Sequence, residues 1–293
     1  MKKIIGFLRL MRPANIVTAV ADILAGIAIS GFFFQPHSDL SRPLLLVLST
    51  IGLYGGGVVM NDFFDADLDA VERPERPIPS GLIPKAQAAA LGVVLLAAGV
   101  GLAFRVTIVA GVIAVVIAIA AVVYDRWAKH HPFMGPLLMG ICRGLNLLLG
   151  LSIIPSQAEV YSFLGIIPVI YIAAITMISQ GEVYGGRRPV MVGAMVLYGV
   201  AMAGVLYVSL LQGNGPFAIV FILFWAIMVF LPLRNAWLKP EGPMIGKAVK
   251  AGVLALILMN AGWAAAFGAL NVALIIVLLL PLSLMLAKIF AVT

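Results

Sequence analysis

Half of the acidic residues of this 293-residue chain lie within one short stretch, residues 62–75. Asp62, Asp65 and Asp69 are three and four residues apart, so on a helix they share one face. Asn61 lies four residues before Asp65 and can add an amide oxygen, whereas Asp67 points away from this face. Three carboxylates on one face repel one another, so the spacing favours a cation as their partner.

The types of these residues indicate which cation they would bind. Oxygen donors without a histidine or cysteine among them favour Mg²⁺ or Ca²⁺. Arg73 and Arg76 follow within a segment that three prolines make rigid. Mg²⁺ is commonly held by one or two carboxylates together with substrate phosphates, so carboxylates followed by arginines predict a pyrophosphate site. The alternative is a solvated, charged loop that only marks the edge of a membrane.

The rest of the chain must then be a membrane-embedded frame for this stretch. Hydrophobic residues make up 63% of the sequence and charged residues only 11%, against roughly a quarter in a soluble domain. We therefore expect an all-α, polytopic membrane protein that forms a single domain over residues 1–293. Ten apolar runs are long enough for membrane-spanning helices, namely 15–34, 43–61, 86–104, 105–124, 133–153, 160–180, 190–211, 217–235, 247–268 and 270–290.

The basic residues predict the orientation of these helices. With the N-terminus in the cytoplasm, most lysines and arginines fall in cytoplasmic segments, as the positive-inside rule requires. The acidic stretch is then cytoplasmic as well, and we expect an integral membrane protein of a bacterial inner membrane. The net charge of +7 follows from this topology, because the basic residues do not gather on one soluble face as nucleic-acid binding would require.

The acidic stretch also resembles a known family signature. The run NDFFDADLDAVERPERPIPSG, residues 61–81, is similar to the first signature of the UbiA superfamily of intramembrane prenyltransferases, NDxxDxxxD followed by RPxRPIPSG. The resemblance implies an all-helical barrel of nine to ten helices around a central cavity, with the run 270–290 as an added C-terminal helix. It also implies Mg²⁺-dependent transfer of a prenyl group from its diphosphate.

The resemblance assigns roles to residues at matching positions of this chain. The loop at 124–129 reads YDRWAK, which is similar to the tyrosine and lysine motif of the family. The implied metal ligands are Asn61, Asp62, Asp65 and Asp69, and the three aspartates are also the implied catalytic residues. The implied pyrophosphate contacts are Arg73, Arg76 and Lys129, of which Lys129 also counts as catalytic, and Tyr124 is the implied cavity residue.

The second signature of the family is altered in this chain. The family motif resembles DxxDVEGDR, and residues 179–188 here read SQGEVYGGRR. Ser179 and Gly186 therefore stand where carboxylates are expected, and Glu182 remains as an acidic metal ligand. Mg²⁺ readily keeps water and phosphate oxygens, so one carboxylate can suffice for a second ion. Arg187 is expected to neutralise part of the pyrophosphate charge.

The apolar run 133–153 carries two polar residues, Arg143 and Asn146, at membrane depth. A buried arginine is costly unless it is paired. Two readings stay open: an internal ion pair, for example with Asp22, or a cavity arginine that faces the substrate phosphates or the acceptor. This run and the GEVYGG segment resemble the EboC-type branch of the family. A small polar acceptor would suit Arg143, Asn146 and Tyr184.

The expected partners are thus a prenyl diphosphate, membrane lipid and a small acceptor, with Mg²⁺ as cofactor and no nucleic acid. The altered second signature motivates one rival, a non-catalytic lipid-binding or transport protein on the same scaffold. A CDP-alcohol phosphotransferase would need a DGxxAR continuation, which is absent after Asp69.

Overall fold

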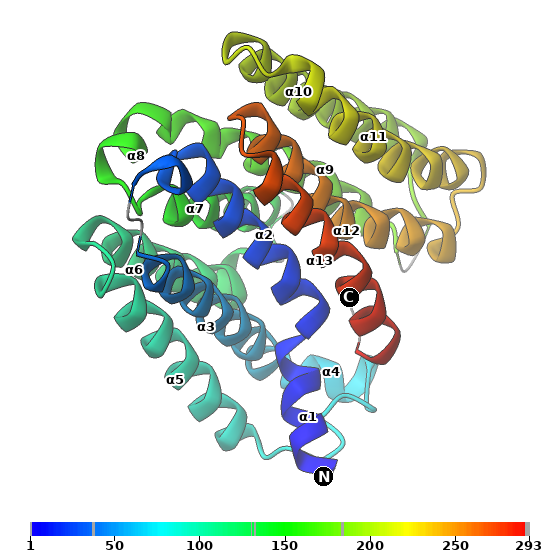
Figure 1. The fold of residues 1–293 in the computed structure, drawn as a ribbon. Helices are drawn as coiled ribbons and strands as arrows, with labels where there is room; N and C mark the ends of the chain where they lie inside the picture. The colour runs from blue at the N-terminus through cyan, green and yellow to red at the C-terminus, as the bar shows by residue number, and fades with distance from the viewer. Residues whose placement is uncertain (1, 37–38, 130, 132, 183–184, 291–293) are drawn as a thin grey trace.

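The computed structural model describes residues 2–36, 39–129, 131, 133–182 and 185–290, and within these ranges the chain is helical throughout, without β-strands (Figure 1). The helices are α1 (Lys2–Met11), α2 (Pro13–Ile29), α3 (Ser41–Phe64), α4 (Ala66–Glu72), α5 (Lys85–Phe104), α6 (Ile108–Val123), α7 (Met134–Leu151), α8 (Pro155–Tyr161), α9 (Ile166–Ser179), α10 (Arg188–Leu211), α11 (Gly215–Leu238), α12 (Gly242–Ala266) and α13 (Leu270–Ile289). Single turns connect some of them: η1 (Phe32–Phe34), η2 (Tyr124–Ala128) and η3 (Ser162–Gly165).

The prediction of nine to ten transmembrane helices is confirmed. In the described part of the chain, nine segments are long and apolar enough to cross a membrane, and the bent pair of α1 and α2 would be a tenth. The run 270–290 forms α13, so the C-terminal helix exists as expected. Proline in the first turn begins α2, α8, α10, α11 and α12, where its missing N–H is not needed.

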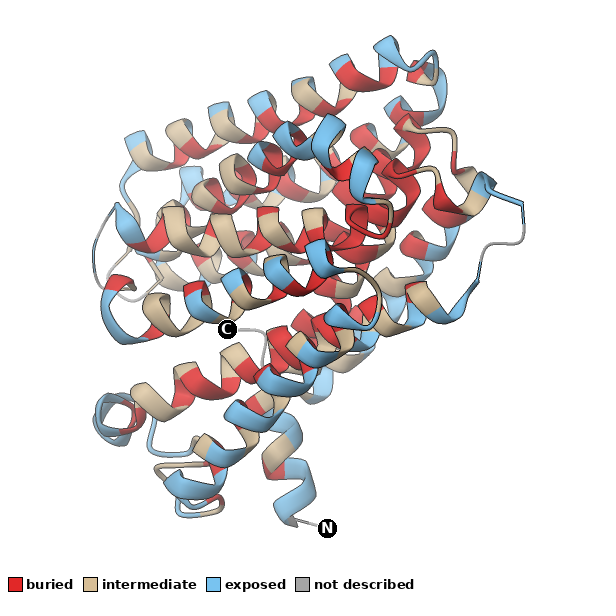
Figure 2. Cartoon of the chain, turned by 90° about the vertical axis from the view of Figure 1, so that its left-hand side faces the viewer, coloured by how far each residue is buried: buried red, intermediate tan, exposed pale blue. Residues whose placement is uncertain are grey.

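Burial divides the helices into an inner and an outer set (Figure 2). Of the apolar windows of the spanning helices, 83% of that in α12 is buried, but only 22% of those in α5 and α13. The outer helices therefore turn apolar side chains outward, as a protein surrounded by lipid requires. Helix α2 packs against α3, α7, α12 and α13, which brings the beginning and the end of the chain together (Figure 1).

Small residues let α2 approach α7 closely. A Cβ atom added to Gly26 would lie 2.2 Å from the carbonyl oxygen of Leu147, and one added to Gly150 would lie 2.3 Å from that of Ile23. Only glycine fits at both positions, which is the way membrane helices gain close backbone contact. This contact fixes how deep the polar residues of α2 and α7 lie relative to one another.

Three irregular points in the helices lie beside one another in space. The backbone of Arg12 is left-handed, with φ of 48°, where α1 and α2 meet at a bend of 44°. Asp65 separates α3 from α4, yet its N–H still donates to the carbonyl oxygen of Asn61 at 2.9 Å. At η2 the chain makes a wide π turn, in which the N–H of Lys129 donates to the carbonyl oxygen of Tyr124 at 3.0 Å. Such turns and bends are frequent at functional sites.

Candidate active site

A cavity of about 520 Å³ lies between the helices and is lined by residues from α2, α3, α4, α6, η2, α7, α9 and α12. This volume is typical of small-molecule binding sites, roughly 300–1,000 Å³. Its walls are apolar in the middle and polar in two places. The apolar wall includes Leu53, Ile117, Ala121, Ile172, Ile175, Val249, Val253 and Leu256.

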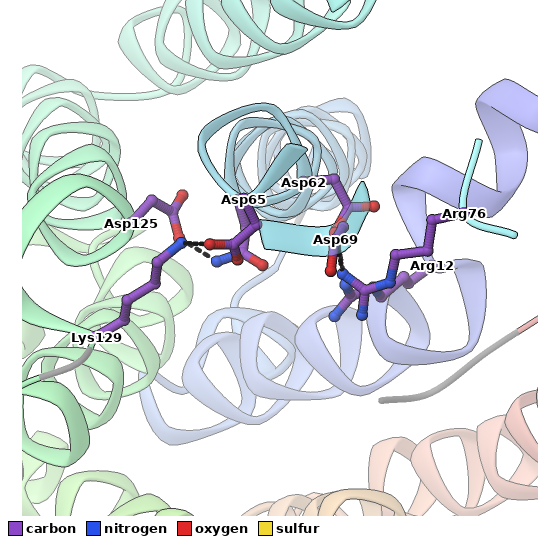
Figure 3. Close-up of polar contacts among 8 residues, drawn as sticks. Arg12, Asp62, Asp65, Asp69, Arg76, Asp125 and Lys129 are labelled. Atoms are coloured by element: carbon purple, nitrogen blue, oxygen red, sulfur yellow. Dashed lines mark hydrogen bonds and ion pairs between the residues drawn. The ribbon is translucent and has the colours of Figure 1, made fainter. Parts of the chain in front are cut away.

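The first polar place belongs to a charged group that we define as Asp62, Asp65 and Asp69 with Arg12, Arg76 and Lys129 (Figure 3). All of them line the cavity except Asp62 and Lys129, which contact the others. The Arg76 guanidinium bridges two of the carboxylates, because its Nη1 lies 2.7 Å from Asp69 and 3.4 Å from Asp62. Arg12 reaches Asp62 from the bend between α1 and α2, at 2.8 Å. Asp62 and Asp69 are both buried, so these two guanidinium groups neutralise carboxylates that water barely reaches.

The remaining carboxylate, Asp65, has a partner on η2. Lys129 donates to Asp65, and four residues earlier on the same turn Asp125 accepts a hydrogen bond of 2.9 Å from the Asn61 amide. Asn61 and Asp65 are themselves four residues apart. The contacts thus form two rungs between the end of α3 and the turn at η2, and Figure 3 shows the one from Lys129 to Asp65.

The structure separates the acidic residues of the stretch as the spacing predicted. The i to i+4 hydrogen bonds continue across Asp65, since the N–H of Asp69 donates to its carbonyl oxygen at 2.8 Å. Asp65 and Asp69 line the cavity together with Asn61. Asp62, which was also expected to bind the metal, is buried against Arg12 and Arg76 and is not among the described lining residues, so its role as a ligand stays a prediction. Asp67, by contrast, has a side chain that is 93% exposed and contacts Lys85 on the surface.

The altered second signature reaches the same cavity through two of its residues. Ser179 and Glu182 both line the cavity, and one carboxylate oxygen of Glu182, Oε1, is buried without a hydrogen-bond partner among the described residues. Burial raises the pKa of Glu182, and the positive charge of Arg73 opposes this shift. Arg187 does not belong to the described lining of this cavity; it borders a separate hollow of about 210 Å³ at the start of α10. Tyr184 lies outside the described residues.

The second polar place is an inner polar group around Asp22, which is fully buried. Its carboxylate accepts hydrogen bonds from Arg143 at 2.7 Å, Asn146 at 3.0 Å and Asn260 at 2.7 Å. The Arg143 guanidinium also donates to Thr18 at 2.6 Å. Helix α2 rises about 1.5 Å per residue, so Asp22 lies roughly 15 Å along the helix from Arg12.

The structure confirms one of the two readings that the sequence left open for Arg143, the internal ion pair with Asp22. Arg143 also lines the cavity, with its guanidinium 4.8 Å from the centre of the Tyr54 ring. Its charge is compensated within the protein at a depth well removed from the charged group. This position does not favour contact with a pyrophosphate held at Arg76. Asn146 and Tyr124 line the cavity, as expected of cavity residues.

The donor atoms at the charged group suit a hard divalent cation. Asn61, Asp65, Asp69 and Glu182 all line one cavity and offer only oxygen atoms, and the Oε1 atom of Glu182 has no described partner. In the described residues, no three carboxylate, histidine or cysteine side chains are arranged so that they could hold a metal ion together. Instead, Arg76 and Lys129 contact the carboxylates, so a bound cation would replace these contacts.

Sequence reasoning missed several members of the site. Asp125 is only 4% exposed and lies at the charged group, and its spacing of four residues from Lys129 was the available signal. The contact of Arg12 with Asp62 joins residues fifty positions apart, and that of Asn260 with Asp22 joins residues 238 apart. Helical periodicity cannot connect such distant positions.

Comparison with known proteins agrees with this geometry. The family model of the UbiA prenyltransferase family matches residues 23–239. The digeranylgeranylglyceryl phosphate synthase of Methanothrix thermoacetophila is 34% identical over 160 residues, which are 55% of this chain and 58% of that protein. The protein of the same name from Natronomonas pharaonis is 27% identical over 268 residues, covering 87% of this chain and 95% of that protein. The alignment with the first of these relatives thus spans little more than half of its length.

Solved structures share the fold. A UbiA homologue from Aeropyrum pernix K1 aligns with a TM-score of 0.72 at 18% identity, over 84% of this chain and 96% of the other. A UbiA homologue from Archaeoglobus fulgidus bound to GPP and Mg²⁺ aligns with a TM-score of 0.65 at 17% identity, over 91% and 99%. The family model covers most of the chain and the fold agrees with it, so this integral membrane protein belongs to the UbiA prenyltransferase family.

Proposed function

We propose that this protein is a Mg²⁺-dependent prenyltransferase that moves a prenyl group from a prenyl diphosphate to a small acceptor and releases pyrophosphate. One observation carries the proposal: carboxylates and cationic side chains gather at one end of a cavity whose further wall is apolar. A diphosphate needs the first environment and a prenyl chain needs the second. The homologue bound to GPP and Mg²⁺ supports the same pairing of ligands.

The charged group would hold the diphosphate. Asn61, Asp65, Asp69 and Glu182 would bind Mg²⁺, which supplies positive charge that makes the pyrophosphate a better leaving group. Arg76 and Lys129, now paired with carboxylates, would turn to the phosphate oxygens, because planar and point-like cations both bind phosphate well. Arg73 lines the cavity beside them and can add a further contact.

The apolar wall would carry the rest of the reaction. When the bond between the allylic carbon and the diphosphate oxygen breaks, the positive charge spreads over an allylic carbon skeleton that water would destroy. Ile117, Ile172, Ile175 and Val249 exclude water from this part of the cavity. An acceptor hydroxyl would then bond through its oxygen to the allylic carbon and release its proton, which an oxygen of the departing pyrophosphate can accept. The pyrophosphate would stay with the cationic side chains.

The inner polar group offers a place for the polar part of the acceptor. Asn146, Thr50 and Tyr54 line the cavity there, and the Asp22–Arg143 pair gives this end no net charge. A neutral hydroxyl or carbonyl group of an acceptor suits this environment. The names of the relatives make glycerol phosphate lipids the first acceptors to test.

A lipid-binding or transport protein on the same scaffold is the rival, and Ser179 in place of a motif carboxylate favours it. The intact charged group argues against it, because binding a lipid alone does not require three carboxylates with three cationic partners. A cytoplasmic position of the charged group follows from the charge distribution of the sequence. The bacterial inner membrane stays a prediction, and the relatives quoted above come from archaea.

The proposal is tested with purified protein, prenyl diphosphates of different length, Mg²⁺ and an acceptor panel that includes prenylated glycerol phosphates. We expect pyrophosphate release that depends on both Mg²⁺ and an acceptor. Asp65→Ala should lower turnover roughly 10²–10³-fold, the usual cost of removing one charge-stabilising group from an active site. Asp67→Ala is the matched control, because Asp67 is exposed and outside the cavity. Binding of prenyl diphosphate without any turnover would favour the rival, and full turnover by Asp65→Ala would contradict the assignment of Asp65.

A further inference from the structure

Asp125 stands apart from the acidic residues that the family signatures explain. It belongs to the wide turn η2, is only 4% exposed, and lines the cavity beside the charged group. Its Oδ1 atom accepts a hydrogen bond from Nδ2 of Asn61 at a distance of 2.9 Å. Figure 3 shows the Asp125 side chain pointing toward the end of α3, next to the contact between Lys129 and Asp65.

This hydrogen bond decides how the Asn61 amide is oriented. An asparagine amide has a donating NH₂ side and an accepting carbonyl side, and the two can exchange places by a half-turn of the side chain. In this structure the NH₂ side of Asn61 faces the Asp125 carboxyl group, whose Oδ1 atom accepts the hydrogen bond. The carbonyl oxygen of Asn61 must then lie on the opposite side of the amide. That oxygen is the atom of Asn61 that a hard cation can use.

We propose that Asp125 is a positioning residue that turns the carbonyl oxygen of Asn61 toward the divalent cation. The proposal rests on the proposed function, because it assumes that Asn61 is a ligand of that cation. Carboxylates and other groups that orient a metal ligand from behind commonly set its affinity for the metal. Asp125 thus acts on the cation through Asn61.

The surrounding structure holds Asp125 in a fixed place for this task. The second rung joins Lys129 to Asp65. Each of these residues lies four positions after its counterpart in the first rung, so the turn at η2 is attached to the end of α3 at two points. The N–H of Lys129 closes the π turn on the carbonyl oxygen of Tyr124, which fixes the backbone on both sides of Asp125. Ser179 stands at a position where the family signature has a carboxylate. The ligands at residues 61–69 must therefore bind the cation with fewer carboxylates from the second signature. The orientation of each remaining ligand then matters more.

The test measures metal binding directly, by electron paramagnetic resonance of Mn²⁺ added to purified protein with inorganic pyrophosphate. Wild type should bind Mn²⁺, and Asp125→Ala should weaken this binding about 10–100-fold, as is usual when the partner of a metal ligand is lost. Asp125→Asn should stay within about threefold of wild type, because its amide oxygen still accepts from Asn61. Asp67→Asn is the matched control for removing one acidic charge nearby, and it should leave binding unchanged.

A double-mutant cycle then separates positioning from direct binding. If Asp125 acts only through Asn61, Asp125→Ala should have no further effect in a protein that already carries Asn61→Ala. Equal losses for Asp125→Asn and Asp125→Ala, or effects that multiply in the double variant, would overturn the proposal and make Asp125 a ligand or a charge acting on its own. Unchanged binding in Asp125→Ala would overturn it as well. Absence of Mn²⁺ binding in wild type would instead contradict the proposed function.

Discussion

Replacement of Arg143 by methionine separates its structural role from a role in substrate binding. Asp22 is fully buried and accepts hydrogen bonds from Arg143, Asn146 and Asn260. Without the guanidinium, the buried carboxylate keeps only amide donors and loses the positive charge that compensates its own. Removing one partner of a buried ion pair costs about 3–5 kcal/mol. This is a factor of roughly two to four powers of ten in the ratio of folded to unfolded protein.

A double variant that removes both charges tests this prediction further. Asp22→Asn together with Arg143→Met removes both charges, and the new amide oxygen still accepts from Asn260. Asn146 keeps its hydrogen bond to the carbonyl oxygen of Ala19, at 2.9 Å. Neutral replacement of a whole buried pair is often without cost, so the double variant should return to within about 1 kcal/mol of wild type.

The assay is unfolding in mixed micelles with increasing sodium dodecyl sulfate, followed by tryptophan fluorescence. Trp225 and Trp263 are fully buried and report on the inner helices. The KM for prenyl diphosphate is measured for the same variants and should be unchanged in the double variant. A double variant that is as unstable as Arg143→Met would refute the ion-pair reasoning. A KM raised tenfold or more in the stable double variant would show instead that Arg143 binds the diphosphate.

Two further predictions concern helix packing and the second signature. Gly26→Ala should destabilise the protein by about 1–3 kcal/mol, because the new methyl group would meet the backbone of α7 at Leu147. Gly101 lies on α5 with open space around it, so Gly101→Ala should be neutral or slightly stabilising in the same unfolding assay. An equal loss of stability in both variants would contradict the packing argument. Glu182→Gln should raise the Mg²⁺ concentration for half-maximal turnover about 10-fold or more. The stability of the protein without Mg²⁺ should be unchanged or higher, since the buried Oε1 then carries no charge. An unchanged Mg²⁺ requirement would remove Glu182 from the metal ligands.

Much of the fold follows from local patterns. Nine of the ten apolar runs coincide with the spanning helices found in the described residues, and the first run, 15–34, contains most of α2, which forms a bent pair with α1. A membrane leaves the backbone no other way to satisfy its hydrogen bonds than within each helix. Helical spacing also predicts that Asp62, Asp65 and Asp69 share a helix face that excludes Asp67. The exposed side chain of Asp67 agrees with this prediction. These features depend on residues within a few turns of one another.

The partners of these residues could not be predicted in the same way. Arg76 contacts both Asp62 and Asp69 across a proline-containing turn. Arg12 contacts Asp62 from the bend between α1 and α2, where its own backbone is left-handed. No spacing rule predicts that a non-glycine residue adopts such a backbone conformation, since it is tolerated only when the surrounding structure holds it.

The sequence by itself thus determined the membrane-spanning helices, the acidic face and the family that the signature indicates. Only the tertiary structure decided which polar groups meet: it selected the pair of Asp22 and Arg143 that the sequence had left open, and it joined Asn61 to Asp125 at the end of the bundle. The reason is physical. Helix formation and membrane insertion depend on neighbours along the chain. An ion pair or a hydrogen bond between helices depends on which helix faces which, and close contacts such as that of Gly26 with α7 set the distance between the helices.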